Sequence, residues 1–226
     1  MRVTANMATF PLRLETSLKV IEKIYNQVDE LRIYLNEYED VPDEYRDSKI
    51  TTHLGEDLKS TGKLFWANNP DEYYFCIDDD IYYPKGYVQR TLSKLQEYDD
   101  DVIISHHGRK FVSNKRVKNY FKDVQEYFHF AQEVRSDSAV EVIGNGVSCW
   151  NTNRVHINWK EFTYLFMDDI FVSKQAHQQG IKRIIVEHEK GYLKPIEEGS
   201  QNALYDKYKN DYGLQTSVFN SVDWWK

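Results

Sequence analysis

The chain has 226 residues, of which 41% are hydrophobic, so it is long enough to build one sizeable core. Its 29 lysines and arginines against 36 aspartates and glutamates give a formal net charge of -7, which argues against a nucleic-acid binder. No stretch approaches the about 20 apolar residues of a membrane span, and the first residues lack the apolar block of a signal peptide. We therefore expect a soluble cytoplasmic protein with no transmembrane segment and no nucleic-acid partner.

The first part of the chain alternates strand and helix patterns. Residues 2–8 are strand-like and end before Pro11, which fixes a turn. Apolar residues at helical spacing then predict a helix over 14–28, and alternation predicts a strand over 31–35. A short strand follows at 49–53. Strand, helix and strand in this order predict a parallel pair with a right-handed crossover, as in an α/β sheet.

The rest of the chain contains further segments of both kinds. We expect strands over residues 73–77, 102–105, 140–143, 147–150 and 184–186. We expect helices within 54–67, after Pro84, over the aromatic-rich stretch 117–134, and from Asp168 to Gly180. The polar and aromatic tail from Gln201 has no clear pattern. Because no repeat or Gly/Ser-rich linker divides the chain, residues 1–226 are expected to form a single domain.

Aromatic residues are unusually frequent, with 17 Tyr, 11 Phe and 5 Trp making up 15% of the chain. They can fill a core, and Tyr and Trp also offer the flat apolar face on which a sugar ring stacks. Composition alone favours a role in the core. Trp150 can be interpreted either as a core residue or as a surface on which a sugar stacks.

The strongest motif is Asp78-Asp79-Asp80, directly after the apolar run 73–77. Ligands of open α/β sheets bind at the carboxyl ends of strands, and carboxylate oxygens suit Mg²⁺ or Mn²⁺. The alternative is a solvated acidic turn in which Asp78 caps the next helix. Three adjacent like charges at the end of a hydrophobic strand repel one another, which favours a bound cation.

A second acidic pair, Asp168-Asp169, stands before a predicted helix. Helix capping is an equally good explanation for this pair alone, because Asp accepts backbone N–H bonds at helix N-termini. Two acidic groups on separate segments favour a functional site over helix capping, since one group can hold a metal while the other accepts a proton from a hydroxyl nucleophile.

The motifs follow one another along the chain in this order: Thr9-x-Pro11-x-Arg13, Asp57, Gly62-Lys63, Asp78-Asp79-Asp80, Gly144-Asn145-Gly146 and Asp168-Asp169. This ordered set resembles a GT-A glycosyltransferase, nearest to the family 2 type, over about residues 3–190. The resemblance implies a single-domain, Rossmann-like GT-A fold with a mixed, mostly parallel central sheet flanked by helices. Within it, about 1–105 would bind the nucleotide, about 106–200 would face the acceptor, and 201–226 would form a C-terminal tail.

The resemblance also implies roles on the donor side. Thr9, Pro11 and Arg13 would lie beside the nucleotide, Asp57 would bond the base, and Lys63 would sit near the base or the diphosphate. Asp78 would approach the ribose, and Asp80, with Asp79, would hold Mn²⁺ or Mg²⁺ bridging the diphosphate.

On the acceptor side, Asp169 matches the acid that deprotonates the acceptor hydroxyl in inverting members. Asp168 stands where the family usually has Glu, which leaves open which of the two does this work. The region of Gly146 would border the donor sugar, and His188 falls where some GT-A enzymes supply a further metal ligand.

We therefore expect a metal-dependent glycosyltransferase that moves a sugar from a nucleotide sugar, with UDP as the expected carrier, to a glycan or lipid-linked acceptor. One alternative is a phosphatase of the haloacid dehalogenase type, although Tyr82 stands where that family commonly has Thr or Val. Another is a non-catalytic, GT-A-like module that binds carbohydrate. The donor sugar, the acceptor and the stereochemical outcome stay open.

Overall fold

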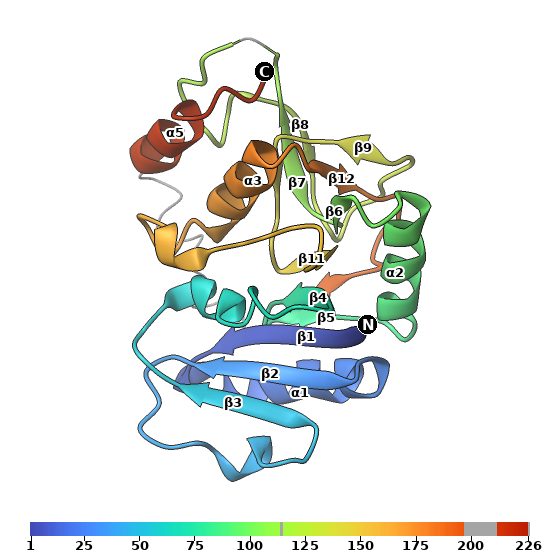
Figure 1. Cartoon of the computed structure of the whole chain (residues 1–226), viewed down its shortest axis with the longest axis vertical. Coiled ribbons are helices and arrows are strands. Elements are labelled where there is room, and N and C mark those ends of the chain that lie inside the picture. Colours follow the sequence, from blue (N-terminus) through green and yellow to red (C-terminus); the bar gives the residue numbers. More distant parts are fainter. Residues whose placement is uncertain (114, 197–211, 226) are drawn as a thin grey trace.

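The central feature of the computed structural model, which describes residues 1–113, 115–196 and 212–225, is an eight-stranded sheet (Figure 1). Its strands are β1 (Arg2–Thr9), β2 (Glu30–Leu35), β3 (Ile50–Leu54), β4 (Glu72–Ile77), β6 (Val102–Ser105), β9 (Ser138–Ala139), β11 (Val147–Asn151) and β12 (Lys182–Ile185). They lie side by side in the order β3-β2-β1-β4-β11-β6-β12-β9.

Most neighbours in this sheet run parallel. The strands β3, β2, β1 and β4 pair in parallel, as do β6 and β12. The strand β11 runs antiparallel to both β4 and β6, and β9 runs antiparallel to β12. The expected α/β class with a mixed, mostly parallel central sheet is therefore confirmed.

Helices cover both faces of the sheet. The α-helices are α1 (Leu14–Ile24), α2 (Tyr87–Glu97), α3 (Asp168–Gln178) and α5 (Tyr212–Asn220). The 3₁₀-helices are η1 (Pro11–Arg13), η2 (Tyr25–Gln27), η3 (Asp43–Tyr45), η4 (Lys59–Leu64) and η5 (Trp159–Glu161). Because successive strand residues point to opposite faces, Phe75 and Ile77 of β4 join the core that contains α1 and α2 residues. Tyr74 and Cys76 join the core on the α3 side.

Trp150 belongs to the α3-side core. Its side chain is fully buried, and its ring stacks on Tyr74 with ring centroids 5.0 Å apart. Of the two interpretations offered by the sequence, the structure supports the core residue, so Trp150 presents no face to a sugar.

Two smaller sheets complete the fold. One has the order β10-β7-β8, with strands at Val142–Ile143, Gly108–Phe111 and Val124–Phe128, and the other pairs β5 (Ile81–Tyr82) with β13 (Lys194–Pro195). The helix expected over 117–134 is therefore wrong, because β8 occupies the middle of that stretch and pairs antiparallel with β7. Local aromatic spacing does not reveal this pairing, which is a long-range contact.

The end of the chain covers the three-stranded sheet. Residues 201–211 and 226 of the expected tail lie outside the described residues, and the part from 212 to 225 contains α5. Phe219 of α5 and Trp224 pack with Phe111 and Tyr120 in a small third core. This packing fixes the segment around Tyr120 against β7.

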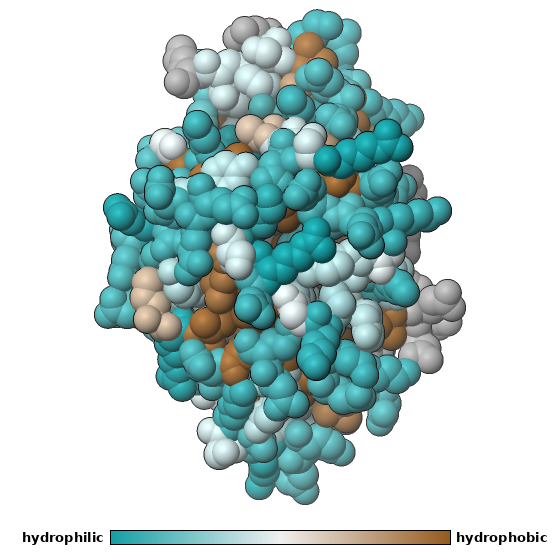
Figure 2. All heavy atoms as spheres, turned by 90° about the vertical axis from the view of Figure 1, so that its right-hand side faces the viewer, coloured by the Kyte–Doolittle hydropathy of each residue, from teal (hydrophilic) through white to brown (hydrophobic). Residues whose placement is uncertain are grey.

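The outer surface is mainly polar where it can be seen. Figure 2 shows one face dominated by hydrophilic residues, with hydrophobic residues confined to small areas. Within the described part of the chain, every helix is too short or too polar to cross a lipid bilayer.

A buried ion cluster stabilises the amino-terminal half of the sheet. The Arg32 guanidinium donates to Glu72 Oε1 at 2.6 Å and to Glu30 Oε2 at 2.8 Å, and its side chain is only 5% exposed.

Arg32→Met leaves two buried carboxylates without their shared cation, so we expect the free energy of unfolding to fall by about 3–5 kcal/mol in urea titrations. Arg2, a 55% exposed partner of Glu30, is the matched control, and Arg2→Met is expected to cost at most about 1 kcal/mol. Equal costs for the two variants would contradict this interpretation.

Candidate active site

A cavity of about 740 Å³ opens at the edge of the sheet where β1 and β4 end. Its walls include most of the residues that the resemblance singles out: Thr9, Arg13, Asp57, Lys63, Asp78, Asp79, Asp80, Gly146, Asp168 and Asp169. Pro11 and His188 do not line it. Residues far apart in sequence thus converge here because the carboxyl ends of parallel strands share one edge.

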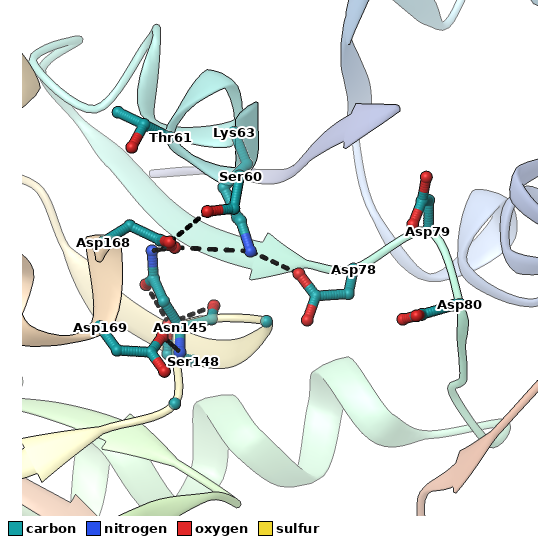
Figure 3. A network of polar contacts seen from close by, with 12 residues as sticks. Ser60, Thr61, Lys63, Asp78, Asp79, Asp80, Asn145, Ser148, Asp168 and Asp169 are labelled. Atoms are coloured by element: carbon teal, nitrogen blue, oxygen red, sulfur yellow. Dashed lines mark hydrogen bonds and ion pairs between the residues drawn. The ribbon is translucent and has the colours of Figure 1, made fainter. Parts of the chain in front are cut away.

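The acidic triplet forms the loop after β4, and its side chains diverge. In Figure 3, Asp80 points toward Asp78, whereas Asp79 points to the other side of the loop. Asp79 is only 6% exposed, and burial raises its pKa to about 7 although the Arg13 charge opposes this shift. The Asp78 carboxylate is turned toward Lys63, so the three carboxylates of the triplet point in different directions (Figure 3).

Arg13 neutralises part of the triplet. Its Nη1 atom donates to Asp79 Oδ1 at 2.6 Å and to Asp80 Oδ2 at 2.7 Å. The 3₁₀-helix η1, with Pro11 as its first residue, brings Arg13 back from the end of β1 to this loop. Pro11 thus acts on the chain direction, and Arg13 is the member of the predicted Thr9-x-Pro11-x-Arg13 motif that contacts the acids.

Lys63 connects the two acidic clusters. Its buried ammonium donates to Asp78 Oδ1 and lies 3.6 Å from Asp168 Oδ2 (Figure 3). Burial alone would lower the pKa of Lys63, but the charges of Asp78 and Asp168 hold it well above its usual value. The side chain therefore remains charged and fixes the spacing of the two carboxylates.

Asp168 and Asp169 begin helix α3 and have different surroundings. Asp168 accepts hydrogen bonds from Ser60 Oγ and, at 3.1 Å, from Asn145 Nδ2, in addition to its ion pair with Lys63. Asp169 accepts the backbone N–H of Asn145 at 2.7 Å on Oδ1. Burial, followed by the charge of Asp168, raises the pKa of Asp169 to about 7. Asp168 is thus held by several partners, and Asp169 is the carboxylate suited to exchange a proton near neutral pH.

The sequence interpretation did not identify Ser60 as a site residue, and of the Gly144-Asn145-Gly146 motif it gave a role only to the region of Gly146. Asn145 is fully buried and contacts both carboxylates of the second pair, and its Oδ1 accepts a hydrogen bond from Ser148 at 2.9 Å. The available signal was an amide residue between two glycines immediately before a strand, a pattern that also describes an ordinary turn.

The glycine at position 146 is required for space. A Cβ atom there would overlap the Asp78 carboxylate. Tyr83 holds the two segments together, because the Asp78 N–H donates to its hydroxyl at 2.8 Å and the hydroxyl donates to the Gly146 carbonyl at 2.5 Å.

Gly146→Ala is therefore expected to displace Asp78, to lower the free energy of unfolding by about 1–3 kcal/mol and to weaken nucleotide binding. Gly180, which has open space around it at a φ of 74°, is the control. Gly180→Ala is expected to cost about 1 kcal/mol through backbone strain and to leave UDP titrations unchanged. A stability cost in Gly146→Ala no larger than that in Gly180→Ala would contradict the close approach.

The predicted nucleotide side of the cavity is built from the ends of β1 and β2. Thr9 ends β1, and Asn36 follows β2 and accepts the Leu58 N–H on Oδ1 at 2.9 Å. The Asp57 carboxylate forms an ion pair with Lys59. Asn36 therefore anchors the loop that carries Asp57 to the sheet, next to Thr9.

His188 lies away from the acidic triplet. Its backbone pairs with Val134 through hydrogen bonds of 2.8 and 2.9 Å, and its ring contacts His106 at a centroid distance of 5.3 Å. The side chain is 3% exposed and does not line the cavity. The structure thus does not bring His188 to the acids with which it was expected to share a metal.

Asp78 and Asp80 fit a cation that a phosphate helps to hold. Among the residues described, no three His, Cys, Asp or Glu side chains come together as a metal-binding group. Mg²⁺ is commonly bound by one or two carboxylates together with substrate phosphates, and Asp78 and Asp80 are two carboxylates of the same loop (Figure 3). The donor set therefore suits a metal shared with a diphosphate and does not suit an all-protein cage.

The opposite wall of the cavity is aromatic. It is formed by β7, β8 and the residues between and next to them, and it includes His107, Arg109, Tyr120, Phe121, Tyr127, His129 and Phe130. This wall faces a space bordered by Asp169 and Gly146 on the other side.

Neither a scan against protein-family models nor a search of the curated proteins finds a match to this chain.

Proposed function

We propose that the protein is a metal-dependent glycosyltransferase that moves a sugar from a nucleotide sugar, with UDP as the expected carrier, to a hydroxyl of a glycan or lipid-linked acceptor. The observation that carries this proposal is the meeting of two acidic pairs from separate segments in one cavity of about 740 Å³. In one pair, Asp78 and Asp80 each use one oxygen in an ion pair, with Lys63 and Arg13, and keep the second oxygen for a cation. In the other pair, Asp169 lies outside the ion pair that holds Asp168.

The donor would lie over the ends of β1 and β4. Asp78 and Asp80 would hold Mn²⁺ or Mg²⁺, which would supply positive charge to the departing diphosphate. Arg13 and Lys63 keep the two carboxylates in position through their ion pairs. Without such cations, the acidic cavity would repel the negatively charged donor.

The acceptor would lie between the aromatic wall and Asp169. The Oδ1 atom of Asp169 accepts the Asn145 N–H, so the second oxygen remains for the hydroxyl proton of the acceptor. A pKa of about 7 makes this carboxylate a stronger proton acceptor than an ordinary aspartate. The Asn145 contacts orient the base, because they fix both carboxylates at the start of α3.

Calorimetric titration with UDP in the presence and absence of Mn²⁺ tests this function. We expect metal-dependent binding to the wild type and its loss in Asp80→Ala, because that variant removes one of the two carboxylates proposed to hold the metal. Asp43, whose side chain is 91% exposed, provides the control, and Asp43→Ala is expected to bind like the wild type.

Two results would replace the proposal by its alternatives. Glycan binding that needs neither metal nor nucleotide would indicate a non-catalytic carbohydrate-binding module. Release of phosphate from a sugar phosphate without a nucleotide would indicate a phosphatase.

A further inference from the structure

Arg109 differs from the other cations that line the cavity. Arg13 is paired with Asp79 and Asp80, Lys59 with Asp57, and Lys63 with Asp78. Arg109 has no ion pair with any carboxylate of the described residues. Of these four cations, Arg109 is therefore the one without an anionic partner among the described residues.

The surroundings of Arg109 favour the binding of an anionic ligand. Its guanidinium carbon lies 4.3 Å from the ring centroid of Tyr127, 5.3 Å from that of Phe121 and 5.4 Å from that of Tyr120. Rings on the faces of a guanidinium leave free the N–H groups that lie in its plane; Arg109 donates to the Tyr120 hydroxyl, and its other N–H groups remain available for a carboxylate or a phosphate. Among the described residues from 107 to 130, none that lines the cavity is acidic.

The local strand pairing fixes this arrangement. Arg109 lies on the central strand β7 of the three-stranded sheet, opposite Tyr127 of β8 and Val142 of β10. Residues directly opposite in antiparallel strands point to the same face, so Arg109 and Tyr127 both face the cavity. The guanidinium therefore comes from a rigid element and not from a mobile loop tip.

A second polar group of this region lacks a partner. Gln215 of α5 lines the cavity, is 6% exposed, and has no hydrogen-bond partner for Oε1 among the described residues. A neighbouring residue of α5, Thr216, accepts the Tyr120 N–H at 3.0 Å, which places Gln215 beside the aromatic wall. An unpaired buried amide oxygen is unfavourable, and a ligand hydroxyl would satisfy it.

This region also reaches the proposed base. Burial raises the pKa of the Tyr120 phenol, Arg109 lowers it and Asp169 raises it, so both charged groups act on the same ring. Arg109, Gln215 and Asp169 all line the same cavity, so a ligand that contacts the first two can present another of its hydroxyls to Asp169.

We propose that the acceptor is an anionic sugar, whose carboxylate or phosphate binds the Arg109 guanidinium while one of its hydroxyls donates to Gln215 Oε1 and its ring stacks on the aromatic wall. The acceptor role rests on the proposed transferase function, whereas the preference for a charged sugar rests on Arg109 alone. Carboxylate and phosphate share the chemistry that a guanidinium recognises, namely paired oxygen acceptors in one plane.

Binding of three small sugars to the full chain, measured by saturation-transfer NMR without nucleotide, tests the proposal. The probes are methyl β-glucuronide, glucose 6-phosphate and methyl β-glucoside, which carry a carboxylate, a phosphate and no charge. We expect the better of the two charged sugars to bind about tenfold more tightly than the neutral one, and this preference to weaken as salt is added. The identity of the better one distinguishes an acidic sugar from a phosphorylated one.

Variants test whether Arg109 causes the preference for a charged sugar. Arg109→Gln is expected to remove it, and Arg109→Lys to retain part of it, because a lysine keeps the charge and loses the paired donors. Arg90, whose guanidinium carbon lies 4.6 Å from the Tyr192 ring centroid, is the matched control, since it is also stacked on a ring but does not line the cavity. Arg90→Gln is expected to retain the wild-type preference.

The outcomes separate this inference from the proposed function. Equal binding of charged and neutral sugars by the wild type, or an unchanged preference in Arg109→Gln, overturns the inference even if UDP binds. A charge preference that depends on Arg109 in a protein that does not bind UDP supports the anionic-sugar site and overturns the acceptor role.

Discussion

Replacing Asp169 with asparagine is expected to lower the rate of sugar transfer by about 10² to 10⁴-fold while leaving the affinity for UDP unchanged. Asparagine retains the shape and can still accept the Asn145 N–H that Asp169 Oδ1 accepts at 2.7 Å. It cannot take the proton of the acceptor hydroxyl. Initial rates with a panel of nucleotide sugars, together with UDP calorimetry, measure the two quantities separately.

The pH dependence of this reaction provides a second readout. A general base acts only when it is deprotonated, and the pKa of Asp169 is raised to about 7. The wild-type rate is therefore expected to fall about tenfold for each pH unit below this value and to level off above it.

Asp168→Asn is the matched variant, because it alters the neighbouring carboxylate that Ser60, Asn145 and Lys63 hold. It is expected to retain a pH-dependent rate, with the midpoint moved to lower pH because a charge that raises the pKa of Asp169 is gone. The pH dependence should be absent from the residual rate of Asp169→Asn. A near wild-type rate in Asp169→Asn would show that another group is the base.

Lys63→Met is expected to lower the free energy of unfolding by about 3–5 kcal/mol, as large an effect as that of Arg32→Met. The Lys63 side chain is 5% exposed and serves Asp78 and Asp168 together, so its loss leaves two carboxylates without their common cation. Urea titrations at neutral pH measure this loss.

Lys59→Met controls for loss of a lysine at the same cavity. Lys59 is 37% exposed, and its ion pairs with Asp57 and Glu37 are partly exposed to water, so a cost of at most about 1 kcal/mol is expected. The double variant Lys63→Met with Asp168→Asn should be less destabilised than the sum of the two single variants, since the second change removes an unpaired charge. Strict additivity would mean that Lys63 and Asp168 do not interact.

The central part of the fold could be predicted because its strands carry strong local patterns. The apolar run 73–77 corresponds to β4 (Glu72–Ile77), and the helical spacing from Leu14 corresponds to α1 (Leu14–Ile24). The convergence of the acidic groups also followed from sequence, since strand ends of a parallel sheet share one edge. The sequence could not predict that Asp168 and Asp169 have different hydrogen-bond partners, because these partners, Ser60 and Asn145, come from other segments.

The acceptor-facing wall was harder to predict for the same reason. The stretch 117–134 contains many aromatic residues, and their spacing indicated a helix, but the strand β8 forms because β7 offers it an antiparallel partner. Position 120 packs on Phe219 from the far end of the chain. Such contacts override local propensity, and a single sequence does not reveal them.

The reversed direction of β11 determines which backbone groups meet the acids. Strands β1 and β4 end at the cavity, whereas β11 begins there, so residues 144–146 bring main-chain N–H groups to an edge otherwise made of strand ends. The contact from residue 145 to Asp169 is made by such a main-chain N–H. Every amino acid except proline carries this donor, so the orientation of the proposed base does not depend on which side chain occupies position 145. Only the contact to Asp168 requires the asparagine amide.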